Sequence, residues 1–213
     1  MRIHTFGCSW THGHGPVDEI ALHSWARVLS ERHPKVEVTN HALCGSSLDY
    51  SVAQLGEVLK HKEESIKIFQ ITAPFRYTVW SQDEIRKHRL RNQNYSFYTE
   101  TAIQKTERYH GGWNSNRVRE DKRFHKYLSV KRNHLAEKWN FLGIHDFLIK
   151  NCDFVFYHMR WDGISNPNLP CIKDTLGQQQ FDKYIHDSGF HFGREGCEWV
   201  ASWVEDNLKV KLP

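Results

Sequence analysis

Short runs of β-branched and aromatic residues alternate along this chain with longer stretches of helical periodicity, and this alternation restricts the fold more than any other feature. The four short runs lie at 2–6, 36–40, 66–72 and 153–158. Apolar residues recur at helical spacing within 20–33, 48–59, 135–150 and 199–208. Strands that alternate with helices predict βαβ units and a mostly parallel sheet covered on both faces. We therefore expect an α/β domain.

The length and composition favour one globular domain that spans 1–213. A chain of 213 residues suits a single domain, and its apolar content of 39% is enough for a core. No apolar run approaches the roughly 20 residues that a membrane-spanning helix needs, and the first residues lack the apolar region of a signal peptide. We therefore expect a cytoplasmic protein with no membrane contact. The five cysteines show no CxxC pairing, so we expect neither a disulfide framework nor a metal site, and no cofactor.

One polar, charged segment at 82–126 interrupts the alternation. More than about 40 residues without clear periodicity inside a domain usually form a lid or a small subdomain. Between 82 and 134 the chain has 13 Lys and Arg against 6 Asp and Glu, or +7, whereas the remainder has 16 against 19, or −3. Basic and aromatic residues mixed in this way favour either a solvated lid or a surface for an anionic partner. We favour an inserted lid and do not expect nucleic acid to be the partner; the oligomeric state is not indicated.

Polar residues follow the ends of the predicted strands, which is where chemistry gathers in parallel sheets. Ser9 follows the first strand on a tight turn, where we expect its hydroxyl to be exposed and its own N–H to help hold an oxyanion. Gly45 follows the second strand, and its N–H is expected to point into the same crevice. Thr72 and Arg76, at the end of the third strand, add a hydroxyl and a guanidinium.

Asp187 and His191 lie on one loop near the C-terminus. A carboxylate on the same loop can fix the tautomer of the imidazole and stabilise its charged form, so that His191 can act as a general base toward a serine elsewhere. Each pattern alone is weak evidence. Together they predict a Ser-His-Asp triad of Ser9, His191 and Asp187.

Segments at 7–13, 40–47 and 187–196 resemble, in this order, conserved blocks of the SGNH hydrolase superfamily, also called GDSL esterases and lipases. The resemblance implies that Ser9 is the nucleophile, that Gly45 supplies an oxyanion-hole N–H, and that Asp187 and His191 complete the triad. It spans nearly the whole chain, although 82–134 has no counterpart. It also implies a flavodoxin-like, three-layer α/β/α sandwich whose mostly parallel sheet has four or five strands.

The sequence departs from the family pattern at three places. Cys8 stands where the family usually has Asp, but that side chain is not the nucleophile. The segment 72–76, Thr-Ala-Pro-Phe-Arg, lacks the asparagine that the family uses in its oxyanion hole, and is similar to a version found in uncharacterised, phage-type members. The spacing between Asp187 and His191 is one residue longer than usual. The loss of one oxyanion donor costs about 10²–10³ in rate in tested systems, so a weak activity is in keeping with this sequence.

These features lead to the hypothesis of ester hydrolysis, as removal of an acyl group such as acetyl from a carbohydrate or another small polar molecule. The Tyr, Trp and Arg residues of 82–126 suit a sugar or an anionic polymer better than a long acyl chain. Candidates for further substrate or oxyanion contacts are Thr72, Arg76, Trp10, His12 and Trp161.

Two alternatives stay open. One is an acyltransferase that uses the same triad, with an alcohol in place of water as the acceptor. The other is a non-catalytic binding protein on the same scaffold, in which the Ser9 hydroxyl would lie more than about 4.5 Å from the imidazole of His191.

Overall fold

The computed structural model describes residues 1–13, 24–43, 46, 48–72, 134–161, 165–185, 191–208 and 210–213. Its sheet consists of four parallel strands in the order β2-β1-β3-β4. They are β1 (Arg2–Phe6), β2 (Glu37–Asn40), β3 (Ile66–Ile71) and β4 (Phe154–Tyr157). The expected α/β fold with a parallel sheet is confirmed. The insertion expected at 82–126 lies outside the described residues.

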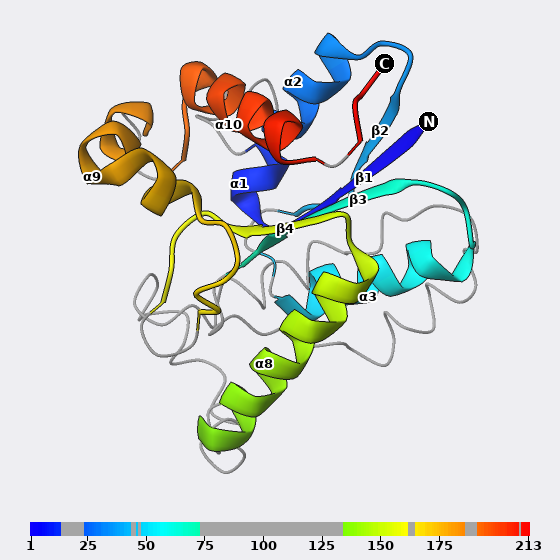
Figure 1. Ribbon diagram of the computed structural model, residues 1–213, viewed down its shortest axis with the longest axis vertical. Helices are drawn as coiled ribbons and strands as arrows, with labels where there is room; N and C mark the ends of the chain where they lie inside the picture. The colour runs from blue at the N-terminus through cyan, green and yellow to red at the C-terminus, as the bar shows by residue number, and fades with distance from the viewer. Residues whose placement is uncertain are drawn as a thin grey trace, which may run out of the picture.

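Helices cover both faces of this sheet (Figure 1). Helices α2 (Trp25–Arg32) and α10 (Arg194–Asn207) pack on one face, and α3 (Leu48–Lys60) and α8 (His134–Asn151) lie on the other. The short helix α1 (Ser9–His12) directly follows β1. None of the helices in the described part of the chain is long and apolar enough to cross a membrane.

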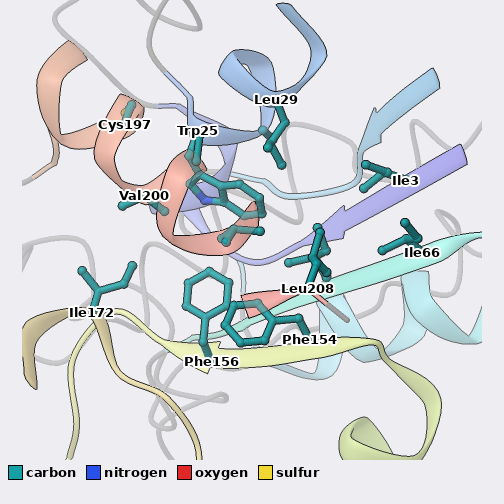
Figure 2. Close-up of a cluster of buried hydrophobic side chains, with 14 of the residues drawn as sticks. Ile3, Trp25, Leu29, Ile66, Phe154, Phe156, Ile172, Cys197, Val200 and Leu208 are labelled. Atoms are coloured by element: carbon teal, nitrogen blue, oxygen red, sulfur yellow. The ribbon is translucent and has the colours of Figure 1, made fainter. Parts of the chain in front are cut away.

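Side chains alternate between the two faces along each strand, and this alternation divides the core in two. Ile3, Ile66 and Phe156 point toward α2 and α10, where they meet Trp25 and Val200 (Figure 2). Their neighbours along the strands point the opposite way, into a second cluster with residues of α3 and α8; these are Phe6, Phe69, Ile71, Val155 and Tyr157. Both faces of β3 and β4 are therefore apolar, as expected for a sheet covered on both sides.

Helix α9 (Ile172–Tyr184) was not predicted from the sequence. Its apolar residues are few, and Gly177 interrupts the helical backbone with a φ of 72°. Only Ile172 and Phe181 of this helix are buried. The periodicity on which helix prediction depends is consequently weak here, although Phe181 reaches the aromatic cluster beside the candidate site.

The connections between the strands define a reversal point at the carboxyl end of the sheet. The chain passes from β1 to β2 along the face of α2, and from β2 to β3 along the opposite face through α3. The strand order therefore reverses between β1 and β3. In open α/β sheets, ligands bind outside the carboxyl ends of the strands at such a reversal. Ser9 follows β1 and Thr72 follows β3, so the two residues flank this point.

Candidate active site

Ser9 and His191 meet at the carboxyl end of the sheet, although 182 positions separate them in the sequence. The distance between Ser9 Oγ and His191 Nε2 is 2.7 Å. Ser9 is the first residue of α1, and His191 lies just before α10. Ser9 is only 5% exposed, so the expectation of an exposed hydroxyl is wrong. The hydroxyl instead faces His191, with which it forms the hydrogen bond.

Gly7 shapes the turn that carries Ser9. A Cβ at this position would lie 2.4 Å from Thr11 Oγ1 and 2.8 Å from Gln70 Oε1. These two oxygens form a hydrogen bond of 2.6 Å, in which the Thr11 hydroxyl donates to the Gln70 carbonyl oxygen. The backbone therefore passes this hydrogen bond so closely that only glycine fits.

Gln70 is a buried polar residue in the middle of an apolar strand, and its amide connects three elements. Its Oε1 accepts from Thr11 in α1, and its Nε2 donates to Nδ1 of His158, just beyond β4, at 2.9 Å. Because Nδ1 of His158 accepts, the neutral ring carries its proton on Nε2. Cys8 Sγ also lies 3.7 Å from the Gln70 amide nitrogen, so Cys8 packs on this network.

Three more side chains hold the same turn from other elements. Asn40, at the end of β2, donates to the carbonyl oxygen of Thr11 at 3.0 Å. Ser24, before α2, donates to that oxygen at 2.8 Å. Ser46 donates to the carbonyl oxygen of Gly7 at 2.9 Å. The position of Ser9 is thus fixed by contacts from β2, β3, α2 and the segment before α3.

The ring of Trp10 packs beside the imidazole of His191 and belongs to a cluster of aromatic rings. The ring centroid of Trp10 lies 5.5 Å from that of His191 and 4.7 Å from that of His158, on which Trp10 stacks. Phe192 meets Trp10 edge-on at 4.8 Å. Trp161 contacts His158 edge-on at 5.3 Å. Trp10 therefore packs directly against the candidate base, whereas Trp161 packs on His158 and Tyr157.

The remaining candidates divide into described and undescribed residues. Thr72 lies one residue beyond β3 and is fully buried. His12 is the last residue of α1, on the same short helix as Ser9. The structure does not describe Gly45, Arg76 or Asp187, so their roles stay predictions from the sequence.

Sequence reasoning missed the network around Gln70 and His158. One signal was present, because Gln70 is the only uncharged polar residue in the run 66–71, which is otherwise apolar apart from Lys67. A polar side chain in a strand covered on both faces needs a buried partner. The partners themselves depend on the register of β3 with β1 and β4, which the sequence does not show.

A cleft of about 680 Å³ lies elsewhere, over β1 and β2 beside the end of α3. The described residues that line it include neither Ser9 nor His191. His4 and His41 form a hydrogen bond of 2.9 Å at its floor. Burial lowers the pKa of both rings, that of His41 to about 4, with a further decrease from the charge of His4.

The sequence matches no family model, and it matches no curated protein. Among solved structures, it is similar to the crystal structure of a lipase/acylhydrolase from Enterococcus faecalis. The alignment covers 100% of this chain and 99% of that one, with 14% identity and a TM-score of 0.45. So distant a likeness says nothing about the chemistry of this chain.

Proposed function

We propose that this protein is a serine hydrolase of the SGNH type that cleaves an ester, with Ser9 as the nucleophile and His191 as the general base. One observation carries the proposal: Ser9 Oγ and His191 Nε2 are 2.7 Å apart. This is the separation expected of a nucleophile and the base that activates it. A non-catalytic binding protein is disfavoured, because that alternative predicts a gap above about 4.5 Å.

The proposed reaction begins with a neutral His191 whose proton is on Nδ1, so that the Ser9 hydroxyl donates to Nε2. Ser9 Oγ attacks the carbonyl carbon of the ester, its proton passes to Nε2, and the carbonyl electron pair becomes an oxyanion. The oxyanion collapses, the ester C–O bond breaks, and His191 gives its proton to the departing alcohol oxygen. Water then attacks the acyl group on Ser9 by the same steps and releases the acid.

Two further groups complete the proposed machinery. Asp187 would accept from Nδ1–H of His191, which fixes the tautomer that the reaction needs and stabilises the imidazolium. The backbone N–H groups of Ser9 and Gly45 would donate to the oxyanion. The support for Asp187 and Gly45 is their position in the sequence blocks at 187–196 and 40–47.

The proposed substrate is an acyl ester of a carbohydrate or another small polar molecule. Its support is the composition of 82–126, where Tyr, Trp and Arg side chains are frequent. Aromatic rings pack on the apolar faces of sugars, and guanidinium groups bind oxygen atoms. A long acyl chain would instead need an extended apolar surface.

The test measures hydrolysis of p-nitrophenyl acetate and covalent labelling by a fluorophosphonate. We expect the wild type to do both, and Ser9→Ala to abolish both. His191→Ala should lower the labelling rate and the turnover by at least about 10³-fold, because the base then no longer activates the hydroxyl. Ser202→Ala is the matched control, since that half-buried hydroxyl on α10 accepts from Arg32 and donates to the carbonyl oxygen of Glu198.

Circular dichroism establishes that each variant is folded. A folded wild type that neither hydrolyses the ester nor reacts with the fluorophosphonate contradicts the proposal. Product analysis with an added alcohol separates the two chemistries that the same residues support. Free acid as the product indicates hydrolysis, whereas a new ester of the added alcohol indicates acyl transfer.

A further inference from the structure

Thr72 lies opposite Ser9 across the point where the strand order reverses. Phe6 of β1 pairs with Phe69 of β3. Ser9 comes three residues after Phe6, and Thr72 comes three residues after Phe69. On the other side of β3, Ile71 pairs with Tyr157, so Thr72 is level with His158. Thr72 is therefore at the same edge of the sheet as the nucleophile.

The face on which Thr72 lies follows from its neighbours along β3. Gln70 points toward α1, where it contacts Thr11, and Ile71 points into the opposite core cluster with α3. Side chains alternate along an extended segment. The side chain of Thr72 is thus on the same side as that of Gln70, which is the side from which α1 and Ser9 start.

The hydroxyl of Thr72 is buried without any hydrogen-bond partner. Thr72 is 0% exposed, and its Oγ1 has no partner in the structure. The other buried serines and threonines of the described chain each have one; these are Thr5, Ser9, Thr11, Ser24, Ser46 and Ser51. A buried hydroxyl without a partner destabilises the fold, and valine would occupy nearly the same volume without that penalty.

We propose that Thr72 is a catalytic residue whose hydroxyl donates a hydrogen bond to the oxyanion that forms when Ser9 attacks. The partner of Oγ1 is then the substrate oxygen, which explains why the folded chain alone provides none. Ser9 and Thr72 are 5% and 0% exposed, so both groups act away from water, where a preorganised donor stabilises developing charge most strongly. This inference rests on the serine-hydrolase function proposed above.

The burial of Thr72 has a consequence for substrate entry. The Thr72 hydroxyl is closed to solvent in this structure, so the carbonyl oxygen of a substrate reaches it only when the side chains that cover it move. The Thr72 hydroxyl needs no rearrangement before it donates. The free-energy cost of removing this hydroxyl from water is already included in the folding of the chain. Because negative charge develops on the carbonyl oxygen during the attack, the interaction stabilises the transition state more than the bound substrate.

The experiment compares Thr72→Val and Thr72→Ser with the wild type, using p-nitrophenyl acetate and subtracting the turnover of Ser9→Ala. We expect Thr72→Val to lower kcat by about 10²-fold or more with KM nearly unchanged, as when one oxyanion donor is removed. Thr72→Ser keeps the hydroxyl and should retain kcat within about tenfold. Thermal unfolding should show a Tm for Thr72→Val that is equal to or above that of the wild type.

Thr5→Val is the matched control for stability. The Thr5 hydroxyl donates to Asn40 Oδ1 at 3.1 Å, so its removal should lower Tm while that of Thr72 does not. Wild-type kcat in Thr72→Val overturns the inference but leaves the hydrolase intact. A Thr72→Ser variant that loses as much kcat and as much Tm as Thr72→Val also overturns it. Equal effects with and without the hydroxyl indicate a packing role. If the folded wild type shows no Ser9-dependent turnover, the proposed function fails, and the inference falls with it.

Discussion

Gly7 lies where the backbone before Ser9 passes the hydrogen bond between Thr11 and Gln70. Gly7→Ala would place a methyl group 2.4 Å from Thr11 Oγ1, so α1 must move or the hydrogen bond must break. Overpacking of this kind costs typically about 1–3 kcal/mol, and under the proposed function a displaced Ser9 loses about 10²-fold in rate. We expect both losses, measured as the free energy of unfolding in urea and as kcat.

Gly56 provides the control for this substitution. It lies inside α3, and a Cβ there would have no atom within 4 Å. Gly56→Ala should therefore raise the free energy of unfolding by about 0.5–1 kcal/mol, because alanine loses less backbone freedom in a helix, and kcat should not change. A Gly7→Ala variant with wild-type kcat would show that the turn tolerates a side chain.

Gln70 differs from another buried glutamine in a way that permits a direct comparison. Gln70→Met leaves Thr11 Oγ1 and His158 Nδ1 without their partner, and removing one partner of a buried hydrogen bond costs about 1–3 kcal/mol. We expect a loss of this size in the free energy of unfolding and a lower kcat. Gln54 Oε1, by contrast, is buried without a partner, so Gln54→Met should be neutral or stabilising. Equal destabilisation by the two substitutions would contradict the role of Gln70.

At the scale of elements, Ser24 connects the start of α2 to α1. Its hydroxyl oxygen accepts from the backbone N–H of Arg27, which caps the helix, and its proton goes to the carbonyl oxygen of Thr11. Loss of an N-cap costs about 0.5–2 kcal/mol. Ser24→Ala should therefore lower the free energy of unfolding by about this amount and also lower kcat, because Thr11 belongs to the helix of Ser9.

Ser24→Thr tests whether the hydroxyl is responsible for this effect. It keeps the oxygen and adds one methyl group, so we expect most of the stability and kcat to return. If Ser24→Ala lowers stability in urea but leaves kcat at the wild-type value, the cap matters for α2 alone and the connection to α1 has no effect on the site.

A helix or strand could be predicted from the sequence where its own residues carry a clear apolar pattern. The four strands were predicted to within a residue or two because each is a short apolar run, and α3 because residues such as Leu48 and Leu55 recur at helical spacing. Helix α9 has no such repeat and was missed. The pair of Ser9 and His191 was predicted because each follows a recognisable break between elements. Gln70 and His158 were not, because hydrogen bonds between strands depend on register, which has no local signal.

At the scale of the whole molecule, buried histidines make the stability depend on pH. Burial lowers the pKa of His41 and of His145 to about 4, from an ordinary value of 6.5, and it lowers that of His4. At His41 and His145, the unfolded chain binds the proton near pH 6.5 and the folded chain only near pH 4. Between these values the unfolded state holds more protons, so the free energy of unfolding decreases as the pH falls.

His33 acts in the opposite direction. The carbonyl oxygen of Pro213 and the carboxylate of Glu205 raise its pKa against a smaller effect of burial. Its contribution to stability is fully present below pH 6.5 and is lost as the pH rises through the raised pKa. Since it is nearly constant between pH 4 and 6.5, it does not oppose the acid loss from His41 and His145. The folded state is therefore expected to lose stability as the pH falls from 6.5 toward 4.

The corresponding experiment measures unfolding in urea at pH 7 and at pH 5 for the wild type, His41→Asn and His145→Asn. One group contributes at most about 1.4 kcal/mol per pH unit, so each substitution should reduce the difference between the two pH values by about 1–2 kcal/mol. The relevant quantity is the difference in the free energy of unfolding between pH 7 and pH 5. His41 also stacks on Phe6 at 4.9 Å, so the loss of its ring lowers stability at both pH values. If both variants keep the wild-type difference, the buried histidines are not the source of the acid sensitivity.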